Sequence, residues 1–157
     1  MKLRLVCVGK LSEVWLKQAT EEYAGRLRHH FTLEIVELKE EKGGRRGDLP
    51  GLLRREAERI LDKVPDQSFV VVLDERGKQF TSEQLAEKLG ERMLHGGQPW
   101  CLVIGGPYGL APEVRQRADL LLSLSKMTFT HQMARVFLLE QLYRSSTILR
   151  NEPYHNQ

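Results

Sequence analysis

The stretch that decides the fold is an apolar run followed by a glycine turn, WCLVIGGPYGL at residues 100–110. Its first five residues are continuously apolar, as is typical of a parallel strand that is covered on both faces. Residues 69–73, FVVVL, have the same character. We therefore expect two buried strands of a parallel sheet, one of which runs directly into a glycine-rich loop.

Strand and helix patterns alternate on both sides of these runs, and nothing marks a second domain. The pattern predicts an α/β fold, a mostly parallel sheet flanked by helices, in one domain over residues 1–157. Residues 39–51, rich in glycine and charge, are expected to form a mobile surface loop. The other predicted strands are residues 3–8, 31–38 and 120–124, and the predicted helices are residues 12–28, 53–64, 82–93, a short one from Pro112, and 131–150.

The last predicted helix is apolar on nearly all sides. Val136, Phe137, Leu138 and Leu139 follow one another directly, and a helix of this kind is buried on more than one side. Packing it on the sheet and on a second subunit would cover both sides. We therefore expect a homodimer.

Composition excludes several classes of protein. With 157 residues, 41% hydrophobic and 29% charged, the chain is neither largely disordered nor fibrous. No apolar run approaches the ~20 residues that cross a bilayer, and the N-terminus lacks the pattern of a secretory signal, so we expect no membrane contact and a cytoplasmic protein. Cys7 and Cys101 lie inside apolar runs, which favours buried thiols over a disulfide or a metal site.

The charge pattern leaves RNA binding open. The chain has 24 Lys and Arg against 21 Asp and Glu, which is too mild to indicate a nucleic-acid-binding protein by itself. Basic residues gather between Arg26 and Lys63, but acidic residues dilute them. A solvated charged face and a surface that contacts RNA remain equally good interpretations.

Three segments should meet where ligands bind in parallel sheets, beyond the carboxyl ends of the strands. They are residues 73–75, 105–110 and 123–130. The glycine turn has neither the Lys-Ser/Thr of a P-loop nor the spacing of a dinucleotide site, so ligand binding and plain turn chemistry stay equally open. The histidines and cysteines do not fall at metal-ligand spacings, and no Gly-x-Ser-x-Gly elbow is present.

Polar side chains then crowd around the last helix. His131 stands at its start, where it can act as a catalyst or simply cap the helix. Glu140 and Arg144 form at least an i,i+4 pair on its surface. Tyr154 and His155 lie on a terminal tail that should fray unless something holds it.

Six ordered motifs resemble the ribosomal RNA large subunit methyltransferase H family, one of the SPOUT methyltransferases. They cover the chain from end to end and lie at residues 2–11, 104–110, 124–129, 131–135, 140–144 and 153–155. The resemblance implies a trefoil knot over about residues 100–157 and a homodimer that binds S-adenosylmethionine and no metal. It also implies methylation at N3 of a pseudouridine in the helix 69 loop of 23S rRNA, on the assembled 70S ribosome.

The resemblance also assigns residues. His155 would be the first candidate for the base that removes the N3 proton, and Tyr154 would stack on or hydrogen-bond the target base. Arg135 and Arg144 would contact phosphate or stabilise a uracil anion, Glu140 would orient one of them, and His131 is the motif histidine. The family's usual proline before that histidine is Thr130 here, which loses rigidity but can cap the helix. The cofactor pocket would be formed by Leu73, Gly105, Gly106, Leu124, Ser125, Lys126, Met127, Thr128 and Phe129.

Three other functions stay open. A ribosome-binding or assembly factor without catalysis would use the same surfaces, and tight binding of S-adenosylmethionine would exclude it. A knotted methyltransferase that acts on tRNA differs only in the RNA that accepts the methyl group. A nucleotide-dependent oxidoreductase is remote, because the glycine fingerprint is missing from the first strand-helix junction.

Overall fold

A five-stranded sheet forms the centre of the protein in a computed structural model that describes residues 1–43 and 47–156. Its strand order is β2-β1-β4-β3-β5, and all neighbouring strands are parallel. The α/β class and the parallel sheet predicted from the sequence are confirmed. The strands are β1 (Lys2–Val8), β2 (Thr32–Leu38), β3 (Phe69–Lys78), β4 (Trp100–Ile104) and β5 (Leu120–Leu122).

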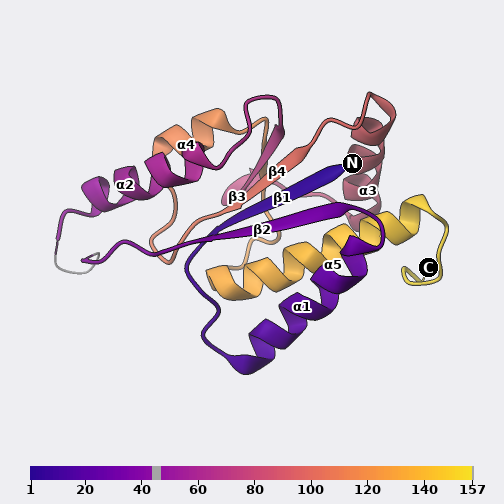
Figure 1. The fold of residues 1–157 in the computed structure, drawn as a ribbon, viewed down its shortest axis with the longest axis horizontal. Helices are drawn as coiled ribbons and strands as arrows, with labels where there is room; N and C mark the ends of the chain where they lie inside the picture. The colour runs from indigo at the N-terminus through magenta and orange to yellow at the C-terminus, as the bar shows by residue number, and fades with distance from the viewer. Residues whose placement is uncertain (44–46, 157) are drawn as a thin grey trace.

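Five helices cover the two faces of the sheet (Figure 1). One face packs on α1, α3 and α5 through a core that includes Leu27, Leu89 and Leu138. The other packs on α2 and α4 through Ile60 and Val114. The helices are α1 (Val14–Arg28), α2 (Leu49–Asp62), α3 (Ser82–Leu94), α4 (Pro112–Arg117) and α5 (His131–Leu149).

The apolar runs take the central positions of the sheet. Strand β4 lies between β1 and β3, and all five of its residues are buried. Edge strand β2 alternates between exposed and half-buried residues. Cys7 and Cys101 are free thiols in the core, as predicted; burial raises their pKa to about 12 and about 11 respectively.

The predicted loop at residues 39–51 is too long by three residues. Helix α2 begins at Leu49, because the Asp48 side chain accepts a hydrogen bond from the Gly51 amide at 3.1 Å. Pro50 stands in the first turn, where its missing N–H has no helical partner to lose. Of this loop, residues 44–46 lie outside the described part of the chain.

The carboxyl ends of β3 and β5 differ from the prediction, and the added part of β3 is polar. Strand β3 continues past Leu73 to Lys78, and Leu122 of β5 pairs with both residues across an irregularity in register. Gly77 permits this close approach, since an added Cβ would lie 2.6 Å from the carbonyl carbon of Leu121. Strand β5 is correspondingly short and ends two residues before the predicted Leu124.

Helix α5 is buried along one side only within this chain. Leu138, Leu139 and Leu142 are fully buried, and the helix packs against both α1 and α3. Phe137 remains 37% exposed, so part of the apolar circumference is not covered by the chain itself. Among the described residues, no helix is both long and apolar enough to cross a membrane.

Candidate functional site

A cavity of about 1000 Å³ opens at the carboxyl ends of β3, β4 and β5. The three segments that the sequence places there do meet in it, together with the first turns of α1 and α5. Lys126 is the one predicted pocket residue that does not line it. The others, Leu73, Gly105, Gly106, Leu124, Ser125, Met127, Thr128 and Phe129, all contribute to its wall.

The glycine turn after β4 forms one wall with its main chain. Gly109 donates its amide to the Gly106 carbonyl at 3.1 Å and has a φ of 86°, a conformation that favours glycine. At Gly105 a Cβ would lie 2.7 Å from the Leu110 side chain and 2.9 Å from the Gly109 carbonyl oxygen. The turn therefore keeps its shape only when residue 105 is glycine.

An ion pair fixes this wall to Asp74 in β3. The Arg115 guanidinium bonds the Asp74 carboxylate and donates to the Leu110 carbonyl at 2.7 Å. Arg76 also donates its amide to Asp74 at 2.9 Å. Burial opposes ionisation of Asp74, but the hydrogen bonds from Arg115 and Arg76 outweigh it and lower the pKa to about 2. Asp74 thus stays negative in the wall of the cavity.

The third wall, residues 123–130, is held by its own side chains. The Ser125 hydroxyl accepts the Met127 amide at 3.0 Å, and Thr128 reaches Glu75 on the β3 side at 3.5 Å. Thr130 caps α5 by accepting the Met133 amide at 3.1 Å, which confirms the capping role predicted for it. The loop is ordered by hydrogen bonds even though the Met127 side chain is 76% exposed.

His131 is the first residue of α5, and Arg135 lies one turn further along the same helix. Arg135 is 1% exposed; it bonds Glu37 at 2.5 Å and the Gly9 carbonyl at 2.8 Å, so its guanidinium cannot reach a phosphate in this structure. His131 lies 3.5 Å from Glu40, and burial lowers its pKa. Both residues tie α5 to the ends of β1 and β2.

The terminal tail turns back along α5 instead of fraying. Asn151 adopts a φ of 54°, and the amides of Asn151 and Glu152 donate to the carbonyls of Ile148 and Thr147. This is the Schellman arrangement, with asparagine in the left-handed position usually held by glycine. The turn returns Tyr154 and His155 to the middle of the helix.

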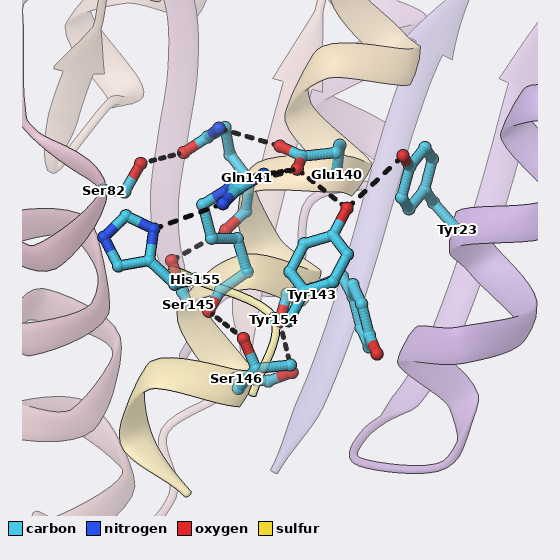
Figure 2. A network of polar contacts seen from close by, with 11 residues as sticks. Tyr23, Ser82, Glu140, Gln141, Tyr143, Ser145, Ser146, Tyr154 and His155 are labelled. Carbon is cyan, nitrogen blue, oxygen red and sulfur yellow. Dashed lines mark hydrogen bonds and ion pairs between the residues drawn. The ribbon is translucent and has the colours of Figure 1, made fainter. Parts of the chain in front are cut away.

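Four of the six predicted catalytic residues come together there, and Figure 2 labels three of them, Glu140, Tyr154 and His155. Arg144 donates to Glu140 at 2.5 Å, and the Tyr154 hydroxyl donates to the same Glu140 oxygen at 3.0 Å. Arg144 also lies 4.7 Å from the centre of the Tyr154 ring. His155 Nδ1 lies 3.2 Å from Arg144. Burial, with hydrogen bonds to Tyr23 and Glu140, raises the pKa of Tyr154 above its ordinary value, so the phenol keeps its proton.

Sequence reasoning missed several partners around the tail. Glu83 lies 2.7 Å from His155 Nε2, and the sequence assigned it no role. Gln141 joins Glu140 to Ser82 through hydrogen bonds of 2.8 and 2.7 Å, as Figure 2 shows. Ser82 and Glu83 belong to α3, far from α5 and the tail in the sequence, so no local pattern could have found them.

Glu140, Arg144, Tyr154 and His155 together form what we call the tail cluster. The cavity and the tail cluster lie at different levels of α5. Met133 lines the cavity, whereas Arg144 is eleven residues further along. At 1.5 Å per residue, Arg144 is about 16 Å from Met133 along the helix axis, and Glu140, seven residues from Met133, is about 10 Å away. A ligand held at Met133 therefore lies at a different level of the helix from Arg144 of the same chain.

Known proteins resemble this chain in sequence and in fold. A family model described as "Predicted SPOUT methyltransferase" matches residues 1–155. A ribosomal RNA large subunit methyltransferase H from Syntrophotalea carbinolica is 53% identical over 157 residues, all of both chains. A probable methylase family protein from Haemophilus influenzae has a TM-score of 0.58 at 14% identity, covering 99% of this chain and 70% of its own. A protein from Legionella pneumophila, solved with the bound cofactor SAM, has a TM-score of 0.51 at 11% identity, covering 93% and 66%.

Proposed function

Because this chain belongs to the SPOUT methyltransferase family, we propose that it transfers a methyl group from S-adenosylmethionine to the large-subunit ribosomal RNA. The specific acceptor is N3 of a pseudouridine in the helix 69 loop of 23S rRNA, on the assembled 70S ribosome. The methyl transfer takes place in the cytoplasm. The knot over about residues 100–157 and the single domain over residues 1–157 belong to the same proposal.

The observation that carries this proposal is the cavity at the strand ends. Its volume of about 1000 Å³ is at the upper end of small-molecule sites, large enough for a nucleoside joined to an amino acid. Its wall contains main chain from the glycine turn, the carboxylate of Glu75 and the carboxylate of Asp74, which Arg115 pairs. Main-chain groups suit the polar edges of an adenosine, and carboxylates suit the positive charges of the methyl donor.

The positions of the cavity and the tail favour a site shared between two subunits. Arg144 and the tail lie far along α5 from the cavity of their own chain, which supports a second copy as their source. Apolar side chains for such a contact are exposed beside the cavity: Trp15 is 56%, Phe129 38% and Phe137 37% exposed. In a symmetric dimer the same surface would pack on itself and complete two sites at once.

Methyl transfer to N3 requires that the protein align the methyl donor with N3 and provide a proton acceptor. N3 forms a bond to the methyl carbon while the carbon–sulfur bond breaks, its electron pair goes to sulfur, and the N3 proton leaves to a base. His155 is the proposed base. Arg144, held by Glu140, would face the negative charge that develops on the uracil ring. Together these groups supply proximity and charge stabilisation in a site partly closed to water.

The decisive experiment is transfer of labelled methyl from S-adenosylmethionine to assembled 70S ribosomes, with separate subunits, free 23S rRNA and bulk tRNA in parallel. We expect label on 70S ribosomes alone, mapped to the helix 69 loop. Label on tRNA would replace the proposed acceptor. Absence of transfer to any RNA by a folded protein would contradict the enzymatic proposal and favour a ribosome-binding factor.

A further inference from the structure

We propose that Glu83 is the positioning residue that makes His155 a base, by fixing the proton of the imidazole on Nε2 and directing Nδ1 toward the reacting uracil. This inference rests on the proposed function, since it concerns the same reaction. Glu83 stands in the first turn of α3, on an element that carries none of the other proposed catalytic residues.

The partners of the ring decide which nitrogen holds the proton. His155 Nε2 lies 2.7 Å from Glu83 Oε1, and a carboxylate only accepts hydrogen bonds, so Nε2 donates. His155 Nδ1 lies 3.2 Å from Arg144 Nη1, and a guanidinium only donates, so Nδ1 accepts. The neutral ring with its proton on Nε2 is therefore the form that this environment selects.

Arg144 occupies the proton-accepting nitrogen in the absence of RNA. It has a second anchor in Glu140, and both oxygens of a uracil ring are acceptors for a guanidinium. When the substrate enters, Arg144 exchanges Nδ1 for a uracil oxygen, and Nδ1 accepts the N3 proton. Proton transfer then converts His155 to imidazolium, whose Nε2–H remains bonded to the Glu83 carboxylate.

The charged groups around His155 support these separate roles of Glu83 at Nε2 and Arg144 at Nδ1. Arg144 and Glu140 face it from α5, Glu83 from α3, and Tyr154 and Tyr23 lie nearby on the tail and on α1. Arg144 and Glu140 neutralise each other through their own ion pair. Within residues 1–43 and 47–156, the Glu83 carboxylate is a negative charge in direct contact with the ring, and it stabilises the imidazolium that forms during the reaction. The same arrangement of a carboxylate behind an imidazole base recurs in hydrolase triads.

The test is the variant Glu83→Gln, which keeps an oxygen near Nε2 but removes the charge. We expect kcat on 70S ribosomes to fall by at least about tenfold, which is less than the ~10²–10⁴-fold that a general base contributes, because the base itself stays in place. The acid limb of the pH profile of kcat/KM should move to lower pH, because the charged ring loses its counterion. The affinity for S-adenosylmethionine should not change, and Glu83→Asp should recover part of the rate.

The matched control is Glu87→Gln, which removes the same charge one turn along the same helix from an exposed residue. It should leave kcat and the pH profile as in the unaltered protein. A kcat for Glu83→Gln equal to that of the control would overturn the inference. So would a lower kcat with an unmoved pH profile and an equally lowered Tm, since Glu83 would then only stabilise α3.

A second readout does not depend on catalysis. The ¹⁵N shifts of the His155 ring should report a protonated Nε2 and an unprotonated Nδ1 in the full-length protein, and Glu83→Ala should mix the two tautomers. A ring with its proton on Nδ1 would overturn the inference even if no RNA accepted a methyl group. Loss of transfer by the unaltered protein, with the expected shifts, would contradict only the proposed function.

Discussion

Arg135 links the end of the sheet to the start of α5 from a fully buried position. Its guanidinium bonds Glu37 and the Gly9 carbonyl at 1% exposure. Replacing it by methionine keeps most of the apolar stem but leaves Glu37 and that carbonyl without their donor. Because Glu37 is 41% exposed and water can reach it, we expect a loss of about 2–3 kcal/mol in the free energy of unfolding, below the range for a fully buried pair.

Urea unfolding of Arg135→Met measures this loss directly. The exposed Arg54 on α2 provides the control, since Arg54→Met removes the same charge and should change stability by less than about 0.5 kcal/mol. Equal stabilities for the two variants would show that the buried network contributes nothing. This prediction concerns folding, so it holds whichever RNA the protein modifies.

Individual residues were predicted well where local pattern determines them and poorly where a distant partner does. Thr130 precedes an apolar helix, and its side chain caps that helix as expected. Arg135 carries the same charge as Arg144, yet one is buried against Glu37 and the other lies in the tail cluster. Glu83 meets His155 across the fold. Sequence spacing contains no information on such contacts, because they depend on how separate elements pack.

Variants of Thr130 test how well this residue replaces the proline that the family usually has before the motif histidine. Thr130 has φ −60° and ψ 149°, a backbone conformation that proline also adopts. Thr130→Ala loses the capping hydrogen bond and should cost about 1 kcal/mol. Thr130→Pro loses the same bond but restricts the unfolded chain, which returns about 0.4–1 kcal/mol. We therefore expect the proline variant to be more stable than the alanine variant in urea unfolding, and the reverse order would mean that the ring clashes with the preceding loop.

The ion pair between Asp74 of β3 and Arg115 of α4 should make the free energy of unfolding depend on pH. The pKa of Asp74 is about 2 in the folded protein against 3.8 for the ordinary carboxyl. Because the folded value is the lower one, the stabilisation is complete above pH ~4 and is lost as pH falls toward 2, in total about 2 kcal/mol. Asp74→Asn should be less stable than the unaltered protein at pH 6 and approach it near pH 2. Parallel stability curves over this range, measured by urea unfolding at each pH, would contradict the assignment.

At the scale of the whole molecule, the order of elements along the chain followed from periodicity, but their order in the sheet did not. Apolar runs marked β3 and β4, and their carboxyl ends located the cavity, since parallel strands end at one edge. The pairing of β1 with β4 joins segments from opposite halves of the chain. Only packing of the helices on both faces fixes such pairings, and it also sets the separation between cavity and tail.

The separation between the cavity and the tail cluster allows a test of whether two subunits share one active site. Gly105→Ala should distort the glycine turn and abolish binding of the methyl donor, and His155→Ala should remove the base. Each variant alone is expected to be inactive. If the tail of one subunit serves the cavity of the other, a mixed dimer holds one site with both parts intact, and equal mixing after dissociation should restore about a quarter of the activity. If each chain supplied its own tail, every site in the mixture would carry one lesion. No activity would then return, although sedimentation would still show dimers.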